Sequence, residues 1–263
     1  MKSLDINEVH DCLLGIAKEF DRICVKHNIP YYMIGGTMLG AIRHKGFIPW
    51  DDDMDFGVPI EHFYKLIAIL EKELPYPYRC CTYNNHPAVL YNFFKIENMT
   101  TVIDSELMPL PLDQQLGVNI DVFPLNRCNI DDKAFNRIKN KRILLTGFEA
   151  SITHPHSVIR KMVKWGLRLI AGGSHININN SIASIINKTN HGDNLCNLLG
   201  RWGKEKEMIP YVWFGQGKRY QFEDVSFVGP KESDEYLSHI YGDYMKMPPE
   251  ESRIPHVNNV YLR

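Results

Sequence analysis

Residues 35–58 read GGTMLGAIRHKGFIPWDDDMDFGV and join a glycine-rich turn to four aspartates within five positions. Like charges this close repel one another, and the repulsion raises the pKa of each carboxyl group. A bound divalent cation relieves that repulsion, because hard cations prefer carboxylate oxygens as ligands. The segment therefore predicts a site for a metal ion.

The local pattern predicts how this segment folds. Residues 31–34 form a short apolar run that is typical of a buried strand ending at the glycine turn. Residues 37–44 suit one or two helical turns, and a second strand is expected over residues 53–58. Alternate side chains of a strand share a face, so Asp53 and Asp55 would lie side by side.

A third acid is expected beside this pair. Asp121 alternates with apolar residues in a predicted strand over residues 118–123. Two carboxylates on one strand can bridge two divalent ions, and a third completes the arrangement that stabilises in-line displacement at phosphorus. The backbone of Gly35 and Gly36 could cradle a phosphate, since glycine permits close approach. The alternative is a solvated acidic loop beside an ordinary strand-to-helix turn.

Hydrophobic periodicity predicts the remaining elements. Helices are expected over residues 5–27, 60–74, 131–145, 157–170 and 181–199, with a strand over 89–96 and a hairpin over 219–228.

Composition limits the class of protein. The chain has 263 residues, of which 44% are hydrophobic and 23% charged, values typical of a globular protein. The net charge of -1 gives no indication of nucleic-acid binding. Residues 1–8 lack the apolar run of a secretory signal, and no stretch approaches the roughly 18 apolar residues of a membrane span. We therefore expect a cytoplasmic protein.

Several segments together resemble one known family. Residues 35–58, the run Ile120-Asp121-Val122-Phe123-Pro124-Leu125 and the run Tyr241-Gly242-Asp243-Tyr244-Met245 occur in the order found in the LicD family. These proteins are phosphocholine transferases of bacterial surface glycans such as lipopolysaccharide and teichoic acid, and they are related to the fukutin-type ribitol-phosphate transferases. The resemblance spans most of the chain and is weakest over residues 131–206.

This resemblance implies an α+β, nucleotidyltransferase-like fold with a central mixed sheet flanked by helices and a helical C-terminal half. Residues 1–126 would form the catalytic core. Residues 127–263 would form a mainly helical part with a terminal hairpin, packed on the core as one continuous unit.

The resemblance also implies site residues. Asp53, Asp55 and Asp121 match the family's metal-binding acids, which would hold Mg²⁺ or Mn²⁺, and Asp121 is also the candidate base for the acceptor hydroxyl. The roles of Asp51 and Asp52 stay open, because either could merely shape the loop.

Other residues are candidates for substrate binding. They are Gly35, Gly36, Thr37, Arg43, Lys45, Trp50 and Lys95. The three basic residues would contact donor phosphates, unless they cap helices or pair with surface acids. A quaternary ammonium group would require an aromatic face within about 6 Å. Candidates for that face, unless they belong to the core, are Phe47, Trp50, Tyr91, Phe93, Trp202, Trp213 and Phe214.

The helix expected over residues 157–170 is strongly amphipathic. Its four basic residues fall within about a 100° arc of a helical wheel, and from Val158 on every other residue is apolar or glycine. Such a helix with Trp165 can lie in an anionic membrane interface, which would suit a lipid-linked acceptor. Alternatively, it packs its broad apolar face on the core.

The predicted activity is metal-dependent transfer of a substituted phosphoryl group, with phosphocholine as the first choice and glycerol or ribitol phosphate as the others. The donor would be a CDP-linked alcohol, and the acceptor a sugar hydroxyl of a cell-surface glycan. One alternative is a nucleotidyltransferase that uses an NTP and a small-molecule acceptor. Another is a glycan- or partner-binding protein without catalysis, placed like the enzyme in the cytoplasm or at the inner face of the membrane.

Overall fold

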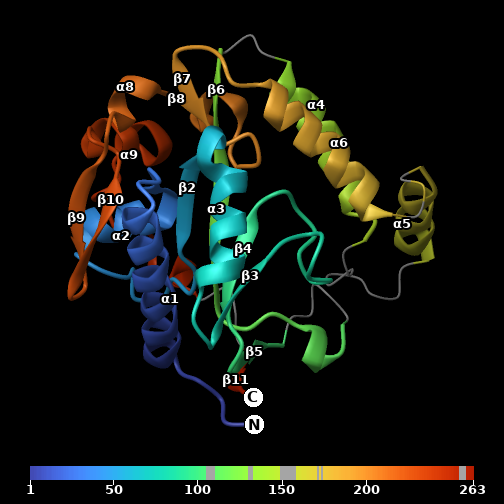
Figure 1. Ribbon diagram of the computed structural model, residues 1–263, viewed down its shortest axis with the longest axis horizontal. Coiled ribbons are helices and arrows are strands. Elements are labelled where there is room, and N and C mark those ends of the chain that lie inside the picture. Colours follow the sequence, from blue (N-terminus) through green and yellow to red (C-terminus); the bar gives the residue numbers. More distant parts are fainter. Residues whose placement is uncertain (105–109, 130–132, 149–157, 171, 173, 255–258) are drawn as a thin grey trace.

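The computed structural model describes the chain except residues 105–109, 130–132, 149–157, 171, 173 and 255–258 (Figure 1). Its first half contains α1 (Ile6–Lys26), β1 (Tyr32–Met33), α2 (Gly35–Arg43), β2 (Asp55–Pro59), α3 (Ile60–Glu73), β3 (Tyr78–Cys81), β4 (Phe94–Asn98), β5 (Thr101–Ile103) and β6 (Asn119–Cys128). Its second half contains α4 (Ala134–Leu145), α5 (Val158–Ile170), α6 (His175–Lys188), β7 (Asn194–Cys196), α7 (Lys204–Glu207), β8 (Met208–Pro210), α8 (Tyr211–Phe214), β9 (Lys218–Phe222), β10 (Val225–Gly229), α9 (Ser233–Tyr241) and β11 (Val260–Leu262).

A mixed sheet forms the centre of the molecule. Its strands run in the order β1-β2-β6-β4-β3, and β7 joins the far end of β6 and carries β8 beside it. Strands β2 and β6 are parallel, whereas the other neighbours are antiparallel. The parallel register places Asp55 opposite Asp121 and Phe56 opposite Val122. The expected mixed sheet flanked by helices is thus present.

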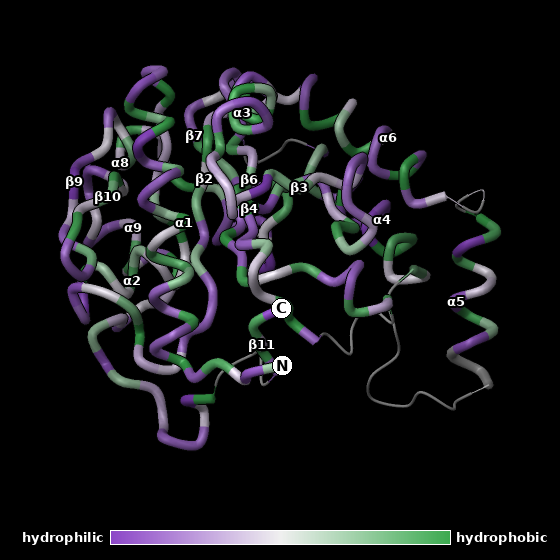
Figure 2. The backbone as a smooth tube through the Cα atoms, turned by 60° about the horizontal axis from the view of Figure 1, so that its bottom comes forward, coloured by the Kyte–Doolittle hydropathy of each residue, from purple (hydrophilic) through white to green (hydrophobic). Residues whose placement is uncertain are grey.

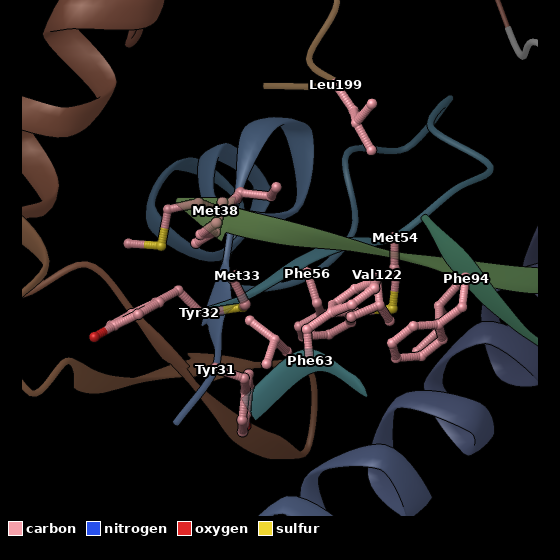
Figure 3. Packing of buried hydrophobic residues seen from close by; sticks show 14 of the residues in the cluster. Tyr31, Tyr32, Met33, Met38, Met54, Phe56, Phe63, Phe94, Val122 and Leu199 are labelled. Atoms are coloured by element: carbon pink, nitrogen blue, oxygen red, sulfur yellow. The ribbon is translucent and has the colours of Figure 1, made fainter. Parts of the chain in front are cut away.

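The hydrophobic core lies between the sheet and the helices α1 and α3. The ring of Phe56 lies 4.9 Å from that of Phe20 in α1. The ring of Phe63 in α3 lies 5.2 Å from that of Phe94 in β4 (Figure 3). Because side chains alternate along a strand, Phe56 and Val122 point into this core. Asp55 and Asp121 are therefore presented on the opposite face.

The first helix begins as its sequence predicts. The Asp5 side chain accepts a hydrogen bond from Glu8 N, and the Glu8 side chain accepts one from Asp5 N. This reciprocal capping satisfies two backbone groups that a helix start would otherwise leave without partners.

The second half is less helical than expected, because it contains β7 to β11 as well as helices. The helix predicted over residues 181–199 is misplaced: α6 covers His175–Lys188, and the chain then forms β7 against β6. Gly192, with φ +116°, lies in the turn between them. Likewise, the strand predicted over residues 89–96 begins only at Phe94. Short apolar runs do not distinguish strand from helix by periodicity alone.

The hairpin expected over residues 219–228 is confirmed by β9 and β10. The last strand, β11, pairs with β5 on one side. On its other side, Tyr261 forms an antiparallel bridge with Ser3, and this bridge brings the two ends of the chain together (Figure 1). Among the described residues, no helix combines the length and apolarity needed to cross a bilayer.

Candidate active site

A cavity of about 780 Å³ opens where the glycine turn meets the aspartate loop. Its walls come from several distant parts of the chain. Residues 34–55 form one side, and the segments 195–209 and 236–254 contribute much of the rest.

The glycine turn shapes the floor of this cavity. Gly35 has φ +55°, which favours glycine, and its N–H donates to the Tyr236 hydroxyl at 3.0 Å. A Cβ atom on Gly36 would lie 2.8 Å from Asp51 Oδ2, so only glycine leaves room for this carboxylate. Thr37 Oγ1 accepts a hydrogen bond from Asp55 N at 2.7 Å. Thr37, predicted to bind substrate, is buried and fixes the start of β2 instead.

Four aspartates line the cavity, and three of them, Asp51, Asp53 and Asp55, come from the aspartate loop and the start of β2, while Asp243 follows α9. Asp53 is exposed, and Asp51 and Asp55 are half-buried. Burial, followed by the charges of Asp53 and Asp52, raises the pKa of Asp51 to about 8. Burial also raises the pKa of Asp55, and Asp53 and Asp121 add to the rise while Lys95 opposes it. Carboxyl groups with raised pKa values fit a hard divalent cation, because such an ion would supply the missing positive charge.

Asp51 lines the cavity with Asp53 and Asp55, although the sequence left open whether this residue only shapes the loop. Strand β2 begins at Asp55, so residues 51–53 lie in a loop where strand alternation does not apply. The ring of His10 donates from Nε2 to the Asp51 carbonyl at 2.7 Å and anchors the loop to α1. Asp52 is not among the residues that line the cavity.

The third predicted acid, Asp121, lies on β6, the strand next to β2. It sits beside Asp55 in the parallel register, but it is not among the lining residues. Lys95 on the next strand forms an ion pair with Asp121 and donates to Asn119 Oδ1 at 3.0 Å. The position of Lys95 therefore does not match its predicted role as a phosphate ligand at the cavity surface.

Of the other two basic residues predicted to contact donor phosphates, one lines the cavity and one does not. Arg43 lines the cavity, and its guanidinium donates to the carbonyl of Tyr244 at 2.9 Å. Lys45 is exposed and lies outside the cavity wall. Sequence reasoning missed Arg142, which lines the cavity and donates to the Leu199 carbonyl at 2.7 Å. Two further basic residues of the wall, Arg201 and Lys246, were also missed.

Aromatic rings cover part of the cavity wall. Of the seven candidates from the sequence, Trp50, Tyr91, Phe93, Trp202 and Phe214 line it, whereas Phe47 and Trp213 do not. Trp202 and Tyr241 meet edge to face with ring centroids 6.1 Å apart. The Trp50 ring lies 5.5 Å from the Arg253 guanidinium. The cavity thus combines an acidic side with aromatic and basic walls.

The hairpin β9–β10 supports the loop that leads to the acids. The Glu223 carboxylate accepts a hydrogen bond from Phe47 N at 3.0 Å. A Cβ atom on Gly46 would lie only 1.9 Å from Glu223 Oε1. Gly46 therefore allows a late segment of the chain to position the aspartate loop.

A second cluster of ligand types lies in another part of the molecule. Cys81, His86 and Glu97 are buried, with Cys81 Sγ 3.2 Å from Glu97 Oε1. Arg79 forms an ion pair with this same carboxylate, and Gly117 N donates to its other oxygen at 2.7 Å. The Gly117 N–H and the Arg79 guanidinium thus stabilise the ionised Glu97 without a metal ion, and together they lower the pKa of Glu97 despite its burial.

Comparison with known proteins identifies the class. Residues 28–155 match the family model described as LicD/FKTN/FKRP, nucleotidyltransferase domain. The whole chain aligns with the lipopolysaccharide cholinephosphotransferase LicD of Haemophilus influenzae, with 26% identity over 277 positions and complete coverage of both chains. The resemblance expected from the sequence is confirmed, and residues 28–155 belong to the LicD family.

Two other proteins show shorter or weaker similarity to this chain. The human ribitol 5-phosphate transferase FKRP is 39% identical over 54 residues, which cover 19% of this chain and 11% of that protein. A solved structure of ANT(2")-Ia in complex with adenylyl-2"-tobramycin covers 66% of this chain and 97% of its own, with 11% identity and a TM-score of 0.25. That score is too low to assign the fold.

Proposed function

We propose that the protein transfers a substituted phosphoryl group from a CDP-linked alcohol to a sugar hydroxyl of a cell-surface glycan. The observation that carries this proposal is the group of Asp51, Asp53 and Asp55 at one side of a cavity that also has basic and aromatic residues in its wall. Similarity to a cholinephosphotransferase and to ribitol phosphate transferases supports the transfer of a phosphoryl group that carries an alcohol.

The acids define where a metal would bind. Asp51, Asp53 and Asp55 offer carboxylate oxygens to Mg²⁺ or Mn²⁺, which would neutralise charge on the donor phosphates when bound. Asp121 adds negative charge beside Asp55, and Lys95 holds it in place. Since Asp121 is not among the residues that line the cavity and is paired with Lys95, we assign it this supporting role and not that of the base predicted from the sequence.

The chemistry is a displacement at phosphorus. The acceptor oxygen forms a bond to the phosphorus that bears the alcohol, the bond from that phosphorus to the bridging oxygen breaks, and CMP leaves with the electron pair. The hydroxyl proton passes to a carboxylate of the acid group. Arg142 and Arg201 at the wall are placed to neutralise charge on the leaving CMP.

The transferred alcohol is assigned from the aromatic wall. The Trp202 ring already interacts with the cations of Arg201 and Lys206, which lie 5.3 Å and 5.0 Å from its centroid, so this part of the wall is suited to cationic groups. A quaternary ammonium group of the donor would compete for this ring, which favours choline over the uncharged glycerol and ribitol. We expect Trp202→Ala to raise KM for CDP-choline while KM for CDP-glycerol changes little. Equal increases for both donors would contradict the choline assignment.

A donor screen tests the whole proposal. The protein is incubated with CDP-choline, CDP-glycerol, CDP-ribitol and each of the four NTPs, with candidate glycan acceptors, in Mg²⁺, Mn²⁺ or EDTA. We expect CMP release from a CDP-linked donor that stops in EDTA and in Asp53→Asn. The exposed Asp11→Asn variant on α1 serves as the matched control and should stay active.

Other outcomes of this screen identify the alternatives. Pyrophosphate release from an NTP alone would show a nucleotidyltransferase. Glycan binding without turnover of any donor would show a binding protein. A reaction fed by CDP-linked alcohols would also agree with the proposed cytoplasmic location.

A further inference from the structure

Helix α5 is held with its apolar side outward. Met162, Val163, Trp165, Leu169 and Ile170 have exposed fractions between 56% and 74%. At 100° per residue, these five positions span an arc of about 160° around the helix. An ordinary surface helix turns such a stripe toward the core, so the expectation that this helix packs its apolar face on the core is wrong.

The opposite side of α5 makes the contacts with the protein. Arg168 Nε donates to the Gly147 carbonyl at 2.6 Å, and its guanidinium lies 5.4 Å from the Phe148 ring. Leu167 Cβ lies 3.0 Å from where a Cβ atom on Gly147 would be, which shows how closely the chain after α4 approaches. These contacts hold Arg168 and Leu167 against the chain after α4.

The helix also stands at the edge of the molecule. In both views it lies beyond α4 and α6, away from the central sheet (Figures 1 and 2). It packs against α4, the helix whose Arg142 reaches the cavity wall. A surface that bound α5 would therefore adjoin the element that forms part of the candidate active site.

We propose that α5 docks on an anionic lipid bilayer, with its apolar stripe in the interface. The charge of the helix selects this partner, because Val158–Ile170 contains four basic residues and no acidic one. Anionic head groups complement that charge, whereas a second copy of α5 would bring two basic helices together. Trp165 lies within the stripe, and tryptophan favours the membrane–water interface.

Vesicle sedimentation tests this proposal without donor or turnover, so its result is independent of the proposed reaction. The full protein is mixed with vesicles of phosphatidylcholine alone or with about a third phosphatidylglycerol, a fraction that gives a strong negative surface potential. We expect binding to the mixed vesicles and much weaker binding to the neutral ones.

Matched variants locate the contact. Leu169→Glu should lower vesicle affinity at least about tenfold, whereas Val25→Glu on α1, at a residue with the same 58% exposure, should not. Lys161→Glu reverses a charge and should lower affinity roughly 30-fold, at about 1 kcal/mol per unit charge. The exposed Lys65→Glu on α3 is its control. Thermal melting of each variant shows whether it is folded.

Tryptophan fluorescence measures how deeply the helix enters the bilayer. Brominated lipids should quench the fluorescence of the wild-type protein, and Trp165→Phe should remove that quenching. Unchanged binding of folded Leu169→Glu, or equal binding to both vesicle types, would overturn the proposal. Absence of wild-type vesicle binding would also overturn it. In that case, a dimer in solution that Leu169→Glu converts to a monomer would assign the stripe to a second copy.

Discussion

Competition between a proton and a metal ion at Asp51 gives a quantitative test of the acid cluster. With its pKa at about 8 in the metal-free protein, Asp51 is about 1% ionised at pH 6 and half ionised at pH 8. A metal ligand must be deprotonated, so below pH 8 the free energy of removing this proton weakens the binding of the metal. We expect the apparent Kd for Mn²⁺ to fall at least about 50-fold between pH 6 and pH 8.

Isothermal titration calorimetry measures both the affinity and the proton. Repeating the titration at pH 7 in buffers with different ionisation enthalpies counts the protons released. We expect about one proton from Asp51 per bound ion, and more if Asp55 also releases its proton. In Asp51→Asn, log Kd should fall less steeply with pH, by about one log unit less per pH unit than in the wild-type protein. Asp11→Asn should keep the wild-type slope.

Two results would refute this reasoning. A wild-type Kd that does not change between pH 6 and pH 8 would mean that no proton competes with the metal. An Asp51→Asn variant with the full wild-type slope would mean that the competing proton resides elsewhere. Failure of Mn²⁺ to bind at any pH would remove the metal from the proposed function.

Three further predictions concern stability, each measured by urea denaturation. Burial raises the pKa of Glu207 from 4.5 to about 7, so folding stability should fall as pH rises between these values; Glu207→Gln should abolish a loss of roughly 3 kcal/mol. A Cβ on Gly57 would lie 2.5 Å from Leu125 Cδ1, so Gly57→Val should cost about 1–3 kcal/mol, and Leu125→Ala should recover part of it. Asn126 Nδ2 donates to two carbonyls at the end of α6, so Asn126→Ala should cost about 1–3 kcal/mol. The first prediction is contradicted if the difference in unfolding free energy between the wild-type protein and Glu207→Gln does not change with pH. The second is contradicted if Leu125→Ala restores no stability to Gly57→Val, and the third if Asn126→Ala has the wild-type urea midpoint.

The sequence was informative about local features and less so about distant ones. The glycine turn and the acids at 53 and 55 could be found because they lie within one short segment. Asp51 was undervalued because the strand was expected to start at residue 53, whereas β2 starts at 55. An error of two residues in a strand boundary changes which side chains alternation describes.

The basic and aromatic walls were harder to predict. Arg142 and Tyr241 reach the cavity through packing of elements about 90 to 190 residues after β2, and periodicity carries no information on such contacts. The only local indication of this wall in the sequence was the basic–aromatic pair Arg201-Trp202, of which both residues line the cavity. For α5, the helical wheel showed two segregated faces, but the orientation of the helix follows from the exposed apolar side chains and from the hydrogen bond of Arg168 to Gly147.

The support that Glu223 gives to the aspartate loop limits how members of this family could be recombined. The region that matches the family model ends at residue 155, yet the residue that holds Phe47 N comes from the hairpin after it. A chimaera that exchanged residues 28–155 alone would join its aspartate loop to a foreign hairpin and a foreign cavity wall. Donor preference should therefore transfer between relatives only when residues 195–254 are exchanged along with the acids.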